Sequence, residues 1–227
     1  MRVLVTGGAG FIGSNFAKKA KQQGWDVTIF DNLSTGHKST VDELEKLGIR
    51  VIIGDIRDRD LLSKETANCT AVVHLAAQVS VPLSVEKPEE TNEINVQGTD
   101  NVIQSCLDND VQRLVVASSA AVYGNADNLP LKEQDAGQTL SPYAESKWLN
   151  EQQILDARNN GLKATALRFF NVYGVGQRPD GAYAAVVPKF VDLMVNKQAP
   201  KINGDGLHTR DFVHVDDVCD AIWSLID

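Results

Sequence analysis

Cysteine is scarce in this sequence, with three residues among 227, and the three lie far apart in the chain. The spacing of Cys69, Cys106 and Cys219 fits neither a disulfide framework nor a metal-ligand cluster, so we interpret them as buried thiols. The four histidines also lack the spacing typical of metal ligands, and a structural role is the expectation for each. We therefore expect no metal site.

Long apolar runs and an excess of positive charge are also missing. No run approaches the roughly 18 apolar residues that a membrane-spanning helix needs, and the first residues lack the apolar core and cleavage site of a secretory signal. We therefore expect a cytoplasmic protein without a membrane partner. The formal net charge of −8 argues against general nucleic-acid binding, but it allows a local basic pocket for a phosphorylated small molecule.

Short apolar runs alternate with amphipathic stretches, which is the order expected of a parallel sheet wrapped by helices. The apolar runs predict strands at residues 3–6, 26–30, 50–53, 71–75, 114–117 and 164–168. The amphipathic stretches predict helices at residues 12–23, 40–47, 59–66, 91–108 and 143–159. Six strands with crossovers of this length predict an α/β fold with a doubly wound parallel sheet of the Rossmann type.

The regular alternation of apolar and amphipathic stretches ends after Asn171, where glycines and a proline mark loops around one helical stretch at residues 184–195. A final apolar stretch, residues 218–226, is expected to return to the sheet as a helix. We therefore predict a Rossmann domain at residues 1–171, followed at residues 172–227 by a small, incomplete substrate-binding region.

Glycines mark the turn between the first strand and the first helix. Gly8, Gly10 and Gly13 satisfy the pattern G-x-G-x-x-G, while Gly7, Gly10 and Gly13 satisfy the related G-x-x-G-x-x-G. Either pattern lets the backbone approach a pyrophosphate, to which the helix N-terminus offers N–H groups and its dipole. The position between a strand and a helix predicts a dinucleotide site.

Asp31 follows Gly13 by 18 residues and ends the second strand, where a carboxylate can accept both hydroxyls of the adenosine ribose. The same carboxylate would repel a 2′-phosphate, and no arginine follows at residues 32–36 to offset it. The sequence therefore favours NAD over NADP. The alternative is an aspartate that only caps a loop.

Further cofactor contacts are expected where the third and fourth strands end, with Asp55 near the adenine edge and small residues that let the cofactor lie close to the backbone. The predicted cofactor-binding residues are Gly7, Gly10, Phe11, Ile12, Gly13, Asp31, Asn32, Ser34, Gly36, Asp55, Ile56, Leu75, Ala76, Ala77, Gln78, Tyr143, Lys147 and Phe170.

Tyr143 and Lys147 are four residues apart, which places both on one face of a helix. A lysine ammonium beside a phenol favours the phenolate, which can take a proton from an alcohol, whereas an unassisted tyrosine titrates near ~10. The pair therefore suggests a general base and the group that lowers its pKa. The alternative for the pair alone is a solvated helix face.

These motifs stand in register with His74-Leu-Ala-Ala, Ser118-Ser119-Ala-Ala-Val-Tyr-Gly124 and Arg168-Phe-Phe-Asn-Val-Tyr-Gly174. Together they resemble extended short-chain dehydrogenases/reductases of the NAD-dependent epimerase/dehydratase family, and most of all the UDP-glucose 4-epimerase group. The resemblance implies a catalytic set of Ser119, Tyr143 and Lys147. It also implies a UDP-sugar as substrate, held by Ser118, Ser119, Asn171, Val187, Ile202 and Arg210.

The reaction that the resemblance implies is inversion at C4 of a nucleotide sugar through a 4-keto sugar. Dehydratases of this superfamily place Asp-Glu where this sequence has Ala120 and Ala121, so dehydration is not expected. Many 4-epimerases carry a threonine at the position of Ala121 that touches the sugar, and Ser118 is expected to share that contact here. The identity of the sugar stays open.

Two other functions remain open at this point: another nucleotide-sugar epimerase, such as a CDP-sugar 2-epimerase or a uronic acid epimerase, and a non-catalytic NAD-binding protein. The family also implies a homodimer, in which the helices at residues 91–108 and 143–159 pair as a four-helix bundle. Family members continue past the helix at residues 218–226 and complete a lid, whereas this sequence ends at Asp227. Either the sequence is a fragment of a longer protein, or we expect an incomplete lid that encloses the substrate less than in its relatives.

Overall fold

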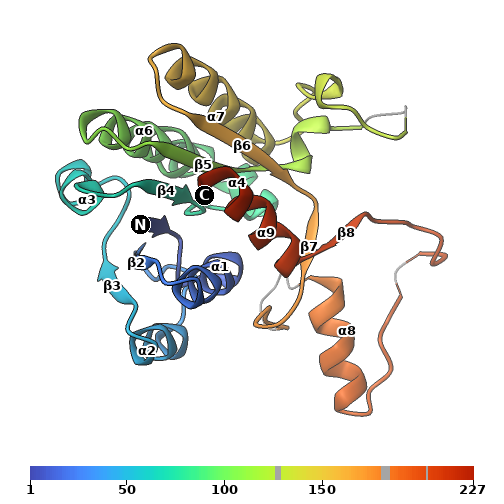
Figure 1. The fold of residues 1–227 in the computed structure, drawn as a ribbon. Coiled ribbons are helices and arrows are strands. Elements are labelled where there is room, and N and C mark those ends of the chain that lie inside the picture. The colour runs from blue at the N-terminus through green and yellow to red at the C-terminus, as the bar shows by residue number, and fades with distance from the viewer. Residues whose placement is uncertain (126–128, 180–184, 203) are drawn as a thin grey trace.

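The computed structural model describes residues 1–125, 129–179, 185–202 and 204–227, and it shows a parallel six-stranded sheet with helices on both faces (Figure 1). The order of the strands is β3-β2-β1-β4-β5-β6, which confirms the predicted doubly wound sheet. These strands are β1 (Arg2–Thr6), β2 (Asp26–Asp31), β3 (Arg50–Ile53), β4 (Ala71–His74), β5 (Arg113–Ser119) and β6 (Ala164–Phe169).

Helices cover the two faces of this sheet in two groups, each with its own apolar cluster. One group is α1 (Phe11–Gln22), α2 (Lys38–Lys46) and α9 (Val215–Ile226), and the other is α3 (Arg59–Thr66), α6 (Gly98–Asp108) and α7 (Pro142–Asn159). In β1, Val3 and Val5 belong to the first cluster and Leu4 to the second, and all three are fully buried. Burial on both faces explains why the strands are continuous apolar runs without alternation.

The predicted helix at residues 91–108 is instead three consecutive segments. It consists of α5 (Pro88–Asn92), a π-helical turn (Glu93–Gln97) and α6. Single π-helical turns often occur at functional sites, and this one places the buried Asn95 side chain toward the end of β4. The short helix α4 (Val81–Glu86), which the sequence did not predict, lies just before α5.

Beyond the carboxyl end of β6 the chain forms a second, two-stranded parallel sheet of β7 (Asn171–Tyr173) and β8 (Phe212–His214). Helix α8 (Val186–Val195) lies to one side of the main sheet and has no fully buried residue, whereas α9 returns to pack against α1, as predicted (Figure 1). Of the predicted range 184–195, residue 184 lies outside the described residues. The proposed domain division at residue 171 falls where β7 begins.

Apolar residues of the two helices expected to pair in a dimer belong largely to the core of this subunit. Ile103 of α6 and Ile154 of α7 are each 3% exposed and pack in the cluster that covers the sheet. Leu149 and Leu155 of α7 are the apolar residues that remain exposed on that helix. The homodimer through residues 91–108 and 143–159 stays a prediction.

Membrane-spanning helices and metal clusters are both absent from the part of the chain that the structure describes. Among those residues, no helix combines the length and the apolar character that a bilayer crossing requires. Within the same ranges, no three histidine, cysteine, aspartate or glutamate side chains form a group that could hold a metal ion.

Three buried side chains, joined by hydrogen bonds, connect β1, β4 and α6. His74 is 2% exposed, its Nδ1 lies 2.6 Å from Thr6 Oγ1, and its Nε2 lies 2.9 Å from Thr99 Oγ1. Burial lowers the pKa of His74 to about 3, and the nearby charge of Lys147 acts in the same direction. His74 is therefore a neutral structural histidine, which agrees with the interpretation from the sequence.

The lowered pKa of His74 predicts acid sensitivity. Between pH 6.5, the ordinary pKa of histidine, and about pH 3, His74 takes up a proton in the unfolded chain but not in the folded chain. The contribution of His74 to the free energy of unfolding is therefore fully present above pH 6.5 and is lost as the pH falls through this window. At a pH of about 4.5 the loss from this group should be about 2–3 kcal/mol. Urea unfolding at neutral pH and at that acidic pH would measure it, and His74→Gln should lose this part of the pH dependence. Parallel pH profiles for the two proteins would contradict the assignment.

Candidate active site

The glycine turn between β1 and α1 is held where a side chain would not fit. Gly7 has a φ of +68°, and a Cβ added there would lie 2.6 Å from the backbone nitrogen of Ala76. A Cβ on Gly13 would lie 2.5 Å from the carbonyl oxygen of Gly7, so α1 packs directly on the turn. Glycine is therefore required at both positions by close approach of backbone, as the predicted dinucleotide site needs.

The N-terminus of α1 is open to a ligand. Its N-cap is Gly10, which has no side chain to accept a hydrogen bond from the first turn. Within the described residues, the first backbone bond of this turn is from Ser14 N to the carbonyl of Gly10, at 3.0 Å. The N–H groups at Phe11 and Ile12 are thus placed to bind a pyrophosphate, with the helix dipole in favour.

Asp31 lies at the end of β2 and borders the glycine turn. Its carboxylate accepts from the N–H of Ala9 at 2.9 Å and from the N–H of Leu33 at 2.8 Å, and the residue is 8% exposed. Gly36 returns to the same place, since a Cβ on it would lie 3.1 Å from Asp31 Oδ1. The carboxylate is thus fixed beside the turn, where it suits a ribose.

Asp55, after β3, is held by side chains from two loops. Arg57 donates to it through Nε at 2.9 Å and Nη2 at 2.8 Å, and Asn32 donates to it at 3.0 Å. The hydrogen bonds from Arg57 hold the pKa of Asp55 well below its usual range. The structure therefore brings Asn32 and Asp55 together. The side chain of Ile56 is buried under Gly98, so only its backbone can serve the predicted cofactor contact.

The loop after β4 is fixed through its backbone. Leu75 N donates to Thr6 O at 3.0 Å, while the N–H and carbonyl of Gln78 both bond the carboxamide of Asn95, at 2.8 and 2.9 Å. The Gln78 amide group donates to Ser80 O and to Thr91 Oγ1. Because the side chain of Gln78 is occupied in this way, its backbone is the part left to contact a cofactor.

Helix α7 carries Tyr143 and Lys147. Lys147 is 4% exposed, its Nζ donates to the carbonyl of Ala117 at 2.9 Å, and burial lowers its pKa to about 8. Ala117 is the residue after the last β4–β5 pair, His74 with Val116, so its carbonyl lies where β4 has ended. Lys147 is thus a buried cation at the carboxyl ends of the central strands.

The phenol of Tyr143 differs from the sequence prediction. Burial raises its pKa, and a hydrogen bond with the side chain of Ser119 lowers it in part. The prediction that Lys147 would leave the phenol with a lowered pKa is therefore wrong for this structure, since Lys147 donates to Ala117 and burial dominates at the phenol. The structure does bring Tyr143 and Ser119 together, as the predicted catalytic set requires.

Ser118 does not occupy the role predicted for it. It is 3% exposed, and its hydroxyl donates to Glu151 of α7 at 2.5 Å. Arg168 of β6 donates to both oxygens of the same carboxylate, at 2.9 and 2.7 Å. Ser118 thus supports the packing of β5 against α7, whereas Ser119 bonds the tyrosine at the start of that helix. The predicted sugar contact of Ser118 does not agree with this arrangement.

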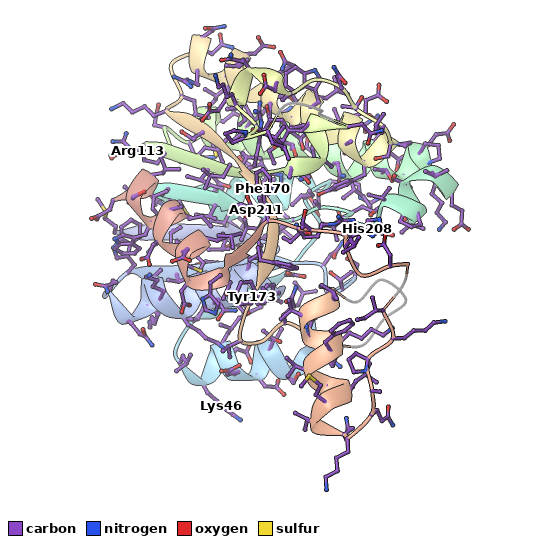
Figure 2. The ribbon with its side chains drawn as sticks, turned by 90° about the vertical axis from the view of Figure 1, so that its right-hand side faces the viewer. Lys46, Arg113, Phe170, Tyr173, His208 and Asp211 are labelled. Atoms are coloured by element: carbon purple, nitrogen blue, oxygen red, sulfur yellow. The ribbon has the colours of Figure 1, made fainter. Side chains whose placement is uncertain are left out.

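The predicted nucleotide-binding residues lie on the smaller sheet and its loops. Asn171 of β7 donates to the carbonyl of Asp211 at 2.8 Å, which brings it next to the exposed Arg210, and Figure 2 shows Asp211 beside Phe170. Phe170 packs near Tyr123, with ring centroids 6.1 Å apart. In contrast, Val187 is half-buried on α8 and Ile202 is 63% exposed, so they form no buried apolar wall.

Sequence reasoning missed the polar residues that support this site. Asn95 donates to Ser146 Oγ at 2.9 Å, and Ser146 in turn donates to the carbonyl of Tyr143 at 2.8 Å. Glu151 could have been found, because it lies eight residues after Tyr143 on the same helix face. Asn95 and Ser84 carried no local signal, since their partners are distant in the sequence.

The close contact at Gly7 predicts a large effect of adding one methyl group. Gly7→Ala should lower the free energy of unfolding by at least about 2 kcal/mol more than Gly24→Ala and should abolish dinucleotide binding. Gly24 is the matched control, because its φ is +81° but nothing lies within 4 Å of an added Cβ. Denaturant unfolding of both variants measures the difference. Equal losses of the free energy of unfolding would show that the positive φ alone, and not the close contact with Ala76, requires glycine at position 7.

The position of Asp31 predicts cofactor preference. Asp31→Asn keeps one acceptor oxygen but loses the charge, so affinity for NAD should fall about tenfold while the ratio of NADP to NAD affinity rises. Calorimetric titration with each dinucleotide measures both values. Asp26→Asn, at the opposite end of β2, should change neither, and an unchanged ratio in Asp31→Asn would refute the ribose contact.

Comparison with known proteins places the chain in a family. Residues 3–227 match the sequence model of the NAD dependent epimerase/dehydratase family. A provisionally named UDP-glucose 4-epimerase of Methanocaldococcus jannaschii is 43% identical over 222 residues, which cover 96% of this chain and 71% of that protein. The UDP-glucose 4-epimerase of Lactobacillus helveticus is 37% identical, with 97% of this chain and 70% of that protein covered.

Solved structures give the same result. The UDP-N-acetylglucosamine 4-epimerase of Methanobrevibacter ruminantium, in complex with UDP-N-acetylmuramic acid, superimposes with a TM-score of 0.94 at 37% identity and covers 99% of this chain and 72% of its own. The UDP-glucose 4-epimerase of Thermus thermophilus, in complex with NAD, gives 0.88 at 36% identity and covers 100% and 75%. The cofactor predicted from the glycine turn and Asp31 is thereby confirmed, and this chain belongs to the NAD-dependent epimerase/dehydratase family.

Proposed function

We propose that this protein is a nucleotide-sugar 4-epimerase of the UDP-glucose/UDP-galactose type that uses NAD. The observation that carries the proposal is the meeting of Ser119 and Tyr143 at the carboxyl end of β5, with the buried Lys147 one helical turn along α7. The names of the relatives support the substrate class, because epimerases of UDP-sugars recur among them.

The roles of the residues follow from their chemistry. The hydroxyl of Ser119 would hydrogen-bond the O4 oxygen of the sugar, and Tyr143 would take the proton from that oxygen and later return it. Lys147 would hold the nicotinamide ribose through its buried ammonium, and the bond with Ser119 is what offsets in part the raised pKa that burial gives Tyr143. The chemistry that bound NAD would supply is reversible hydride transfer at C4 of the sugar, and inversion would require the 4-keto sugar to turn over in the pocket before it is reduced again.

The nucleotide would lie on the smaller sheet. Arg210 is exposed beside Asn171, and a guanidinium binds phosphate oxygens through two parallel hydrogen bonds. Val187 and Ile202, although they do not form a buried wall, lie in the same region of the chain and stay in the proposal as contacts to the base.

The residues that follow β5 distinguish the proposed epimerization from dehydration, another reaction of the family. Ala120 and Ala121 open a short 3-10 helix next to Ser119, so neither position offers an acid or base to eliminate water. Epimerases of other nucleotide sugars share the remaining groups, and the relatives include a UDP-N-acetyl-alpha-D-glucosaminuronate decarboxylase of Bacillus cytotoxicus at 35% identity. A substrate panel separates these reactions, and a non-catalytic NAD-binding protein would turn over none of the panel. A homodimer through the helices at residues 91–108 and 143–159 stays a prediction.

The proposal predicts conversion of UDP-galactose to UDP-glucose without added cofactor by protein isolated with its NAD. Tyr143→Phe should lower kcat by at least about a hundredfold, because it removes the hydroxyl that carries the proton. Tyr173→Phe on β7 is the matched control and should keep the rate. Chromatography of the nucleotide sugars measures the reaction. If none of the common nucleotide sugars is converted, the proposal is wrong.

A further inference from the structure

Ser84 links two helices at a point that neither the predicted catalytic set nor the cofactor site includes. It lies in α4 and is fully buried. Its hydroxyl donates to the carbonyl of Val81 at 2.7 Å and accepts from the backbone N–H of Tyr143 at 3.1 Å. The second bond joins residues 59 positions apart and ends on the backbone of the proposed base.

The first turn of α7 shows why this bond matters. Pro142 has no N–H, Ala144 N donates to Ser141 Oγ at 3.1 Å, and Glu145 N donates to Ser141 O at 2.9 Å. Ser141 thus caps the helix from within its own segment, as the N-cap residue normally does. The N–H of Tyr143 is the donor of this turn that is satisfied from another element, and Ser84 supplies the acceptor.

Helix α4 is itself tied to the loop that follows β4. Gln78 Nε2 donates to Ser80 O at 3.1 Å, and Ser80 is the N-cap of α4, with its hydroxyl accepting from Leu83 N at 3.3 Å. The backbone of Gln78 is fixed by Asn95. The loop expected to border NAD and the residue expected to be the base are therefore joined through Ser84.

We propose that Ser84 is a positioning residue for Tyr143. By fixing the backbone of Tyr143 against α4, its hydroxyl sets where the phenol lies relative to Ser119. This inference rests on the proposed function, because it assumes that Tyr143 is the base. The role assigned to Ser84 is exerted through the backbone of Tyr143.

The test compares Ser84→Ala with Ser105→Ala. Ser105 is a matched control, since it is also fully buried in a helix, but its hydroxyl has no partner among the described residues. In Ser84→Ala, kcat for UDP-galactose should fall about tenfold, while KM and the affinity for NAD stay within about twofold. The midpoint of the pH profile of kcat should move to higher pH, because a displaced phenol loses its bond with Ser119. Ser105→Ala should change none of these quantities by more than about twofold.

Two further variants separate positioning from packing. Ser84→Thr keeps the hydroxyl and should restore most of the lost kcat, whereas Ser84→Cys is also larger than serine but offers a weak acceptor and should resemble Ser84→Ala. If Ser84→Ala does not fold, the comparison of Thr with Cys decides the question. Equal kcat and equal pH midpoints in these two variants would overturn the proposal.

A measurement without turnover keeps this inference distinct from the proposed function. Amide hydrogen exchange at Tyr143 should be at least about tenfold faster in Ser84→Ala than in the wild type, and unchanged in Ser105→Ala. Titration of the phenol by ultraviolet absorbance, with Tyr143→Phe as the blank, should show a higher midpoint in Ser84→Ala. If the wild type converts no nucleotide sugar, the proposed function fails while these two measurements still decide the role of Ser84. Unchanged exchange and an unchanged phenol midpoint would overturn that role.

Discussion

The geometry of the site depends on the hydrogen bonds that the carboxamide of Asn95 makes. It bonds both backbone groups of Gln78 after β4 and donates to Ser146 of α7, so one buried side chain joins the expected cofactor loop to the helix that carries the base. The π-helical turn places Asn95 there, and the backbone carbonyl of Asn95 accepts a hydrogen bond from the side chain of Asn150 of α7 at 2.8 Å. A buried carboxamide whose donors and acceptor are all bonded rigidifies its surroundings.

The two helix N-termini at the site are treated in opposite ways. Helix α1 begins at Phe11 and its N-cap, Gly10, has no side chain, which leaves the N–H groups and the dipole of the helix to an anionic ligand. The first turn of α7 has its donors satisfied by Ser141 and by Ser84, so these N–H groups are not left for a ligand. The first arrangement suits binding of a pyrophosphate, and the second suits a base whose position must not vary.

The charged side chains at the carboxyl ends of the central strands have two different surroundings. Glu151 and Arg168 form a largely buried ion pair that fixes Ser118, α7 and β6 to one another. Lys147 is a buried cation that bonds only a backbone carbonyl among the described residues, and burial lowers its pKa to about 8. A cation without a carboxylate partner keeps its field available to a phenolate or a cofactor, whereas a paired one contributes structure.

Local sequence pattern determined the sheet, the glycine turn and the pairing of Tyr143 with Lys147 on one helix face. Apolar runs specify strands that are covered on both faces, glycines specify a turn without room for Cβ, and a spacing of four specifies one side of a helix. These features depend on neighbours in the chain, so the sequence shows them directly.

Tertiary structure decided the rest, because packing brings together residues whose spacing carries no pattern. It turned Ser118 toward Glu151, placed Ile103 and Ile154 in the core, and let burial set the pKa of Tyr143. It also brought Ser84 to the N–H of Tyr143 across 59 residues. The sequence by itself named the groups that could do the chemistry; only the fold decided which way each one points and what holds it there.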